Sequence, residues 1–225
     1  MITIAPSVLA ADPLAMKSAV VALGDDVRLL HLDVMDGRFV PNVTYGPGLG
    51  KALCGLDLAP VEAHLMVEDP ERHIPYWAGT GVFRLIVHAE ATWDLLRTIQ
   101  RIHGAGFQAG VAINPATPFA PLLEVLHAAD LLLFMTVSPG FGGQELVPSV
   151  LEKLRRFDAA TGGRHPPVEV DGGVGPAEVD AVVGAGARVL VAGSAIFGSA
   201  DPAAALREMT RRAEAAVRTS ATAGE

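Results

Sequence analysis

Residues 61–113 read VEAHLMVEDPERHIPYWAGTGVFRLIVHAEATWDLLRTIQRIHGAGFQAGVAI. Short apolar runs with β-branched residues alternate here with longer stretches in which apolar residues recur at helical spacing. The runs predict strands at Val61–Met66, Phe83–His88 and Gln108–Ile113, and the stretches between them predict helices at Pro70–Ala78 and Thr92–Gly104. This alternation is typical of βα units that form a parallel sheet.

The same alternation extends over nearly the whole chain. Further strands are predicted at Ile2–Pro6, Arg28–Val34, Leu131–Val137, Val168–Asp171 and Arg188–Ala192. Further helical stretches are predicted at Pro13–Leu23, Tyr45–Leu53, Pro118–Ala128, Pro148–Ala160, Pro176–Gly184 and Pro202–Val217. Eight units in 225 residues average about 28 residues each, which is the size of a βα repeat. Eight such units close most simply into a (β/α)₈ barrel.

An open doubly wound sheet is the alternative arrangement of βα units. Its Gly-x-Gly-x-x-Gly turn after the first strand is absent, because Ser7-Val8-Leu9-Ala10 stands there. No break in composition and no Gly/Ser-rich linker divides the chain. We therefore expect an α/β protein with a single-domain (β/α)₈ TIM barrel over residues 1–218, and a disordered C-terminal tail over residues 219–225.

The composition limits the classes of partner. Hydrophobic residues make up 50% of the chain and charged residues 19%, a balance that excludes general disorder. The formal net charge of −8 argues against a basic surface for nucleic acid or for anionic lipid, so we expect neither nucleic acid nor a membrane as a partner. An anionic ligand would have to be held by local geometry.

Cysteine usage and the N-terminus indicate a cytoplasmic protein. Cys54 is the only cysteine, which excludes an internal disulfide and any multi-cysteine metal site and fits a reducing compartment. The N-terminal residues lack the basic segment of a signal peptide, and Pro6 interrupts their apolar stretch. The longest charge-free run, Ile102–Leu123, contains three prolines and is not expected to span a membrane.

The ionisable residues at the carboxyl ends of the strands are candidates for chemistry, because catalytic groups of barrel enzymes collect there. His31 and Asp33 are two residues apart on one strand, so both side chains point to the same face. His64 lies on the next strand, two residues after Glu62, and Asp171 ends the seventh strand. Two His and two Asp can converge there as nitrogen and oxygen ligands of a divalent transition ion.

Taken singly, a histidine at a strand end is more often a pocket wall or a satisfied core residue than a ligand. Four such residues on three strands are harder to explain in that way, because a buried Asp or His without a partner costs several kcal/mol. We interpret His88 as pocket wall, and Asp36 in Met35-Asp36-Gly37 as a turn residue rather than a second catalytic acid.

Glycine-rich loops follow the last three predicted strands. They are Ser138-Pro139-Gly140-Phe141-Gly142-Gly143-Gln144, Asp171-Gly172-Gly173 and Ala192-Gly193-Ser194. Any one of them is explained by a turn that needs positive φ. Together they lie where barrels commonly bind phosphate, and glycine lets backbone N–H groups approach an anion closely. We therefore predict a phosphate site built without Lys or Arg.

The lysines exclude several mechanisms. Lys17, Lys51 and Lys153 are the only three, and all fall within predicted helices outside the barrel. A Schiff-base aldolase or a lysine-dependent decarboxylase would need a lysine at a strand end. A Gly-x-Ser-x-Gly nucleophile elbow is also absent, and Cys54 has no evident catalytic setting.

In order along the chain, these motifs resemble the ribulose-phosphate 3-epimerase family, and the resemblance extends from Ala5-Pro6-Ser7 to Gly193-Ser194-Ala195-Ile196-Phe197. The segments that carry it are His31-Leu32-Asp33-Val34-Met35-Asp36-Gly37, Phe39-Val40-Pro41-Asn42, His64-Leu65-Met66-Val67, Met135-Thr136-Val137, Pro139-Gly140-Phe141-Gly142-Gly143-Gln144 and Val170-Asp171-Gly172-Gly173-Val174.

The resemblance implies a metal-dependent (β/α)₈ isomerase of carbohydrate metabolism, in the pentose phosphate pathway. It would interconvert D-ribulose 5-phosphate and D-xylulose 5-phosphate by two-aspartate proton transfer through a metal-stabilised enediolate. The cofactor would be one divalent metal ion (Fe²⁺, Zn²⁺, Mn²⁺ or Co²⁺), and the partner a phosphorylated ketose. Carried over by position, the metal ligands would be His31, Asp33, His64 and Asp171.

The same resemblance assigns further roles. Asp33 and Asp171 would be the catalytic acid/base pair. The substrate-binding residues would be Ser7, His64, the pocket methionines Met35, Met66 and Met135, and the phosphate-binding Gly142, Gly143, Gly172, Gly173, Gly193 and Ser194. Whether the protein forms a homo-oligomer is left open.

Three departures from the family pattern stand out. Asp25-Asp26-Val27-Arg28 before the second strand and Gly81-Val82-Phe83-Arg84 before the fourth are interpreted as packing changes, because they lie on the face remote from the chemistry. Arg38 stands where the family usually has His, near the site, where it could alter a lid or the substrate range.

The residue types are consistent with this chemistry, since inverting C3 requires proton removal on one face and proton return on the other. Two alternatives stay open: a 3-epimerase of a longer ketose phosphate such as allulose 6-phosphate, and a non-catalytic protein that binds metal or sugar phosphate.

Overall fold

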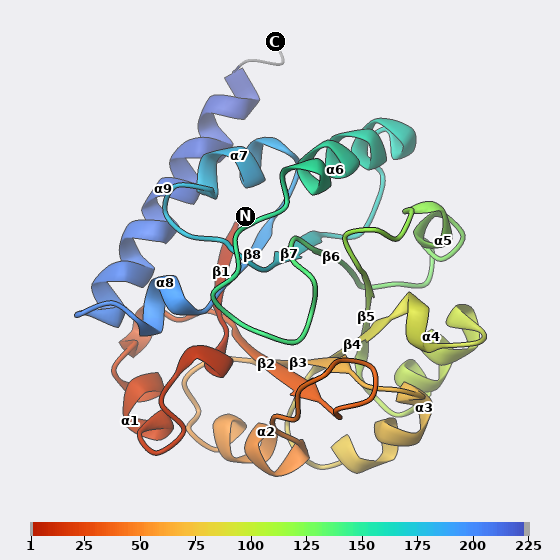
Figure 1. Cartoon of the computed structure of the whole chain (residues 1–225), viewed down its shortest axis with the longest axis horizontal. Helices are drawn as coiled ribbons and strands as arrows, with labels where there is room; N and C mark the ends of the chain where they lie inside the picture. Colours follow the sequence, from red (N-terminus) through yellow and green to blue (C-terminus); the bar gives the residue numbers. More distant parts are fainter. Residues whose placement is uncertain (1, 223–225) are drawn as a thin grey trace.

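The computed structural model describes residues 2–222, and for residues 220–222 only the backbone is described. Within this range a single domain forms around one eight-stranded parallel sheet, as predicted (Figure 1). The strands are β1 (Thr3–Pro6), β2 (Leu30–Met35), β3 (Val61–Met66), β4 (Arg84–His88), β5 (Gln108–Ile113), β6 (Leu131–Met135), β7 (Val168–Asp171) and β8 (Val189–Ala192). They pair in the order β1-β8-β7-β6-β5-β4-β3-β2, and a parallel bridge between Ser7 and His31 joins β1 to β2 and closes the barrel.

Helices surround the ring of strands (Figure 1). They are α1 (Met16–Val21), α2 (Pro47–Cys54), α3 (Pro70–His73), α4 (Leu95–Gly104), α5 (Ala120–Leu123), α6 (Pro148–Thr161), α7 (Val179–Gly184), α8 (Ser194–Phe197) and α9 (Pro202–Thr222). No helix within residues 2–222 combines the length and the apolar character that crossing a bilayer requires.

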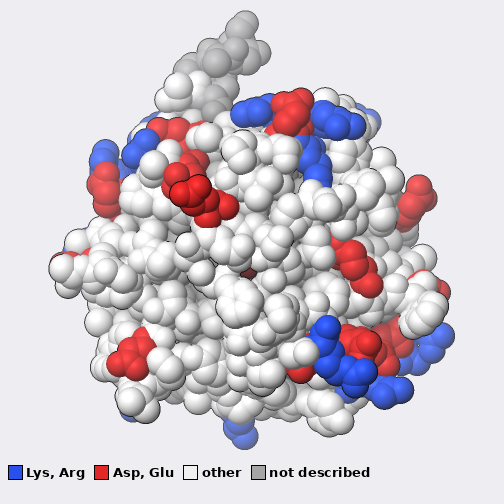
Figure 2. Space-filling model, viewed as in Figure 1, with Lys and Arg blue, Asp and Glu red and all other residues white. Residues whose placement is uncertain are grey.

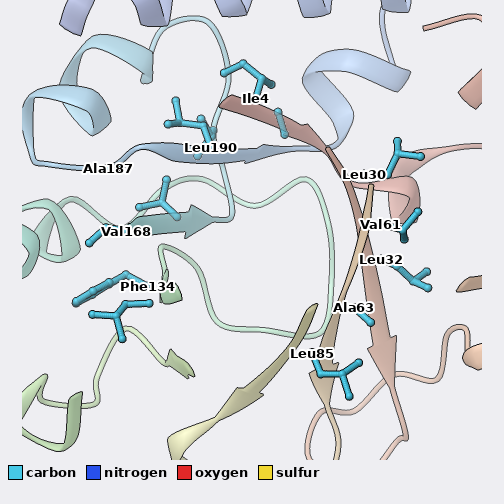
Figure 3. Packing of buried hydrophobic residues seen from close by; sticks show 14 of the residues in the cluster. Ile4, Leu30, Leu32, Val61, Ala63, Leu85, Phe134, Val168, Ala187 and Leu190 are labelled. Atoms are coloured by element: carbon cyan, nitrogen blue, oxygen red, sulfur yellow. The ribbon is translucent and has the colours of Figure 1, made fainter. Parts of the chain in front are cut away.

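The barrel wall separates two packing faces, because successive strand residues point to opposite sides. In β2, Leu30 and Leu32 belong to the main hydrophobic cluster between strands and helices, whereas His31 and Asp33 point into the barrel. Figure 3 shows Leu30, Leu32, Leu85 and Phe134 directed away from the centre of the ring. The alternation therefore leaves the inner face available for polar chemistry.

Helix α6 shows how the outer layer packs. Val150, Leu154 and Phe157 recur at helical spacing and are buried against the barrel. Gly162, with φ 59°, adopts the left-handed conformation that ends the helix. The helix begins at Pro148, with three residues between it and Gln144, where the glycine-rich loop that follows β6 ends, so its packing holds the chain just beyond that loop.

Several boundaries differ from those predicted. Helix α4 begins at Leu95 rather than Thr92, because the side chain of Asp94 accepts a hydrogen bond from the Arg97 N–H and caps the helix. The regular part of the predicted Pro118–Ala128 helix is α5, Ala120–Leu123. Helix α9 continues to Thr222, past Thr219, where the tail was predicted to begin; residues 223–225 lie outside the described range.

Candidate active site

Four of the predicted site residues converge inside the barrel at the carboxyl ends of three strands. One ligand atom from each of His31, Asp33, His64 and Asp171 lies within 4.8 Å of the others. The register pairs Asp33 with His64 across β2 and β3, while Asp171 reaches the cluster from β7. The Nδ1 atom of His64 lies 3.2 Å from Asp33 Oδ1 and 3.5 Å from Asp171 Oδ2.

Burial makes the charges in this cluster interdependent. His31 and His64 are inaccessible to solvent, and 4% of the Asp33 side chain and 14% of the Asp171 side chain are exposed. Burial alone would raise the pKa of Asp33, but the nearby imidazoles outweigh burial and hold this pKa well below its usual range. Burial would likewise lower the pKa of His31 and His64, but the adjacent carboxylates outweigh it and raise both values. Without a metal ion, the carboxylates thus hold protons on the histidines.

The cluster fits a metal ion. Among the residues that the structure describes, His31 Nε2 is a buried nitrogen without a hydrogen-bond partner, and it faces the cluster at 3.4 Å from Asp33 Oδ1. A buried unpaired nitrogen is costly unless something binds it. Two imidazole nitrogens and two carboxylates form a donor set suited to a divalent transition ion, whose charge the two carboxylates balance. The site could therefore hold such an ion.

A second buried group lies beneath His31 and was not predicted. His31 Nδ1 is 3.0 Å from Glu62 Oε1 and 3.1 Å from Glu169 Oε1, and Arg84 Nη1 donates to Glu62 Oε2 at 2.8 Å. Burial and the charge of Glu62 raise the pKa of Glu169 to about 8. Glu62 and Glu169 each stand two residues before a predicted ligand, His64 and Asp171. This spacing on the same strand face was the available signal.

His88 lies behind His64 and is absent from the cavity lining, so its interpretation as pocket wall was wrong. The two Nε2 atoms are 2.9 Å apart, and His88 Nδ1 is 3.3 Å from Glu90 Oε2. Burial lowers the pKa of His88 to about 4, so this imidazole is neutral at physiological pH.

A cavity of about 510 Å³ opens beside the carboxylates of Asp33 and Asp171. Most of the predicted substrate-binding residues line it: Ser7, Met35, Met66, Met135, Gly142, Gly143, Gly172, Gly173, Gly193 and Ser194. His64, predicted as both ligand and substrate contact, does not line the cavity. Ser7 Oγ donates to Asp33 Oδ2 at 2.6 Å, which fixes the orientation of that carboxylate.

The glycine-rich loops meet above the barrel, where the loop after β6 crosses the centre of the view (Figure 1). Gly173 has φ 66°, and a Cβ there would lie 2.4 Å from the Leu146 nitrogen. Loops after β6 and β7 thus touch backbone to backbone, which only glycine permits. In Figure 2 the Lys and Arg side chains lie around the edge of this face, and none lies at its centre. An anion held here would meet backbone N–H groups.

The loops after β2 and β3 are joined by Asp36. Its carboxylate accepts hydrogen bonds from the N–H groups of Arg38, Phe39 and Glu68, which confirms it as a turn residue and holds its pKa low despite partial burial. Arg38 pairs with Glu68 at 2.7 Å with 72% of its side chain exposed, and it does not line the cavity.

Comparison with known proteins places this architecture among characterised families. The Ribulose-phosphate 3 epimerase family model matches residues 3–197. The chain is 43% identical over 220 residues to the ribulose-phosphate 3-epimerase of Bacillus subtilis, covering 93% of this chain and 98% of that protein. It is 43% identical over 216 residues to that of Mycobacterium leprae, covering 94% and 95%.

A solved structure, that of KGPDC from Streptococcus mutans, superposes with a TM-score of 0.73 over 96% of this chain and 99% of that chain. Because the two sequences are only 15% identical, this likeness shows a shared fold and nothing further. The family match and the two relatives extend over most of the sequence and include the strands that carry the cluster. The chain therefore belongs to the ribulose-phosphate 3-epimerase family of isomerases.

Proposed function

We propose that this protein is a metal-dependent 3-epimerase that interconverts D-ribulose 5-phosphate and D-xylulose 5-phosphate. The observation that carries the proposal is the meeting of two carboxylates from separated strands on one cavity. Asp33 stands on β2 and Asp171 on β7, with β1 and β8 between them on the shorter way round the barrel. The names of the relatives support the substrate.

Inversion at C3 uses both carboxylates in turn. One removes the C3 hydrogen as a proton, which leaves an enediolate, and the other returns a proton to the opposite face. A substrate lying between β2 and β7 presents one face of C3 to each aspartate. Because the two roles exchange with the direction of the reaction, one aspartate must be protonated whenever the other is ionised.

The surroundings of Asp33 favour its ionised form in the metal-free site. The imidazoles hold its pKa low despite burial, and the Ser7 hydroxyl donates to Oδ2. In the direction in which Asp33 removes the proton, Asp171 would enter protonated. Ser7 keeps the Asp33 carboxylate in one rotamer, so that each catalytic cycle starts from the same geometry.

His31, Asp33, His64 and Asp171 would hold one divalent ion. When bound, this ion supplies Lewis-acid polarisation of the ketose oxygens next to C3. His31 Nε2 and His64 Nδ1 face the cluster and would be the two nitrogen ligands. In this account the glycine loops, with Gly142, Gly143, Gly173 and Gly193, hold the phosphate by backbone N–H groups.

A coupled assay of ribulose 5-phosphate turnover tests the proposal. We expect activity to vanish after treatment with a strong chelator and to return on addition of Fe²⁺, Mn²⁺, Co²⁺ or Zn²⁺. Full activity in enzyme shown to be free of metal would contradict the metal site. Unphosphorylated ribulose should show both a lower kcat and a higher KM, because binding of the remote phosphate positions C3. An equal kcat for the two sugars would contradict the phosphate site.

A further inference from the structure

A line of hydrogen bonds runs outward from His64, away from the cavity. His64 Nε2 is 2.9 Å from His88 Nε2, and His88 Nδ1 is 3.3 Å from Glu90 Oε2. The centroids of the two imidazoles are 5.0 Å apart and their planes differ by 18°. With the nitrogens at 2.9 Å, the rings lie nearly end to end in one plane. A nitrogen lone pair of one ring therefore faces an N–H of the other.

The outer end of this line fixes where the protons sit. Glu90 Oε1 accepts from the Asn114 N–H at 2.8 Å and from the Thr117 hydroxyl. Lys153 holds the same loop by donating to the carbonyl oxygens of Asn114, Pro115 and Thr117. The Asn114 N–H can only donate, so Oε1 must be an acceptor and Oε2 is the oxygen left for His88.

The proton positions follow from donor and acceptor counting. A carboxylate oxygen accepts, so His88 Nδ1 donates to Glu90, and the other nitrogen of a neutral His88 is an acceptor. His64 Nε2 must then carry a hydrogen. The remaining nitrogen of His64, Nδ1, is directed at Asp33 and Asp171, and any proton on it is the one that a metal ion would displace. Both imidazoles are inaccessible to solvent, so water cannot replace either partner.

We propose that His88 and Glu90 are positioning residues that hold His64 in the tautomer whose Nδ1 can bind the metal ion. This inference rests on the metal site of the proposed function. A histidine that binds a metal commonly donates its other N–H to an outer partner, and loss of such a partner typically weakens metal binding by about 10–100-fold. Here the outer partner is itself a histidine, oriented by a carboxylate on the next turn, η4 (Ala89–Ala91).

Glu90→Gln tests the proposal with little change in shape. The amide oxygen keeps the acceptor for Asn114 and Thr117, and its NH₂ group then replaces the oxygen that faces His88. His88 Nδ1 must now accept, its Nε2–H donates to His64, and the His64 proton moves to Nδ1, where it blocks the ligand position. Long-range ¹H–¹⁵N NMR of the metal-free protein reads both tautomers directly, without any activity measurement.

We expect wild-type metal-free protein to show a proton on His64 Nε2 and His88 protonated on Nδ1, and Glu90→Gln to show no proton on His64 Nε2 and His88 protonated on Nε2. Titration with Co²⁺, followed by its visible absorption, should give a Kd about 10–100-fold higher for Glu90→Gln. Glu152→Gln on α6 makes the same charge change at an exposed position and should leave both readouts unchanged. His88→Gln retains an acceptor for His64 and should bind Co²⁺ more tightly than His88→Leu, which has none.

Two results would overturn the proposal: wild-type His64 without a proton on Nε2, or a Glu90→Gln variant with the wild-type tautomers and Kd. Failure of the proposed function looks different. If the wild-type protein bound no Co²⁺ while the tautomers still changed in Glu90→Gln, the metal site would be wrong and the hydrogen-bonded line from Glu90 to His64 would be upheld.

Discussion

At the scale of single residues, both proposed nitrogen ligands are held from behind by buried or partly buried polar groups. His31 contacts Glu62 and Glu169 through Nδ1, and His64 contacts His88 through Nε2. The cluster residues His31 and Asp33 were predictable, because strand periodicity placed both on one face. Strand spacing also put Glu62 on the same face as His64, but its contact with His31 depends on the pairing of β2 with β3, which one strand alone does not specify.

Glu62→Ala should destabilise the fold strongly. Glu62 is fully buried, and its removal leaves Arg84, whose side chain is 13% exposed, without its carboxylate. Removing one partner of a buried pair typically costs about 3–5 kcal/mol. Urea unfolding of the metal-free protein measures the loss. Glu152→Ala, which breaks an exposed pair with Arg155, should change the free energy of unfolding by less than about 1 kcal/mol. Equal losses in the two variants would contradict the assigned role of Glu62.

Glu90 should make the free energy of unfolding fall as the pH is lowered in the acid range. Despite burial, hydrogen bonds from His88, Asn114 and Thr117 lower its pKa from 4.5 to about 2. A lowered folded-state pKa contributes stability that is present above the unfolded value, near 4.5, and is lost as pH falls toward 2. Urea unfolding of the metal-free protein measures this effect at about pH 5.5 and about pH 3, on either side of the unfolded-state pKa of 4.5. The amount by which wild type is more stable than Glu90→Gln should be smaller at the lower pH. A difference that stays constant or grows would contradict the assignment.

At the scale of elements, the strands were the most predictable parts and the helix ends the least. The predicted strand Val61–Met66 matches β3, which has the same bounds. A short run of this kind, buried in the barrel wall, has few conformations available other than a strand. Helix ends depend on caps and side-chain contacts. Asp94 starts α4 three residues after the predicted beginning, and α5 is regular only over Ala120–Leu123. The close contact between the loops after β6 and β7 depends on tertiary structure. The only trace of it in the sequence is that residue 173 is a glycine.

Gly173→Ala should disturb the glycine-rich loops that are proposed to bind phosphate. The new Cβ would lie 2.4 Å from the Leu146 nitrogen and 2.8 Å from the Gln144 oxygen, so the loops after β6 and β7 must separate. Gly24→Ala is the matched control, since φ is 64° there and no atom lies within 4 Å of the added Cβ. Both variants carry backbone strain of about 1–3 kcal/mol. We expect only Gly173→Ala to raise KM for ribulose 5-phosphate, by about tenfold or more. Equal KM values would contradict the contact.

At the scale of the whole molecule, barrel closure is what assembles the site. Asp33 and Asp171 are far apart in the sequence, and they meet because β1 and β8 join β2 to β7 on one side of the ring. Because β8, β7 and β6 are neighbours in the sheet, the glycine loops that follow them lie next to one another, and all three line the cavity. In the proposed function, a chain with net charge −8 would thereby bind an anion without a cationic side chain. The central claim is that the two aspartates act on opposite faces of one carbon.

Solvent exchange in D₂O with metal-loaded Asp33→Asn and Asp171→Asn tests that claim most directly. Each variant keeps the base for one face only, so each should exchange deuterium into C3 of one epimer, and the two variants should prefer opposite epimers. Epimerisation should fall by about 10²–10⁴-fold in both. Metal content is measured in parallel, since both residues are proposed ligands. Near wild-type epimerisation in both variants, with the metal site shown to be full, would contradict the two-aspartate mechanism.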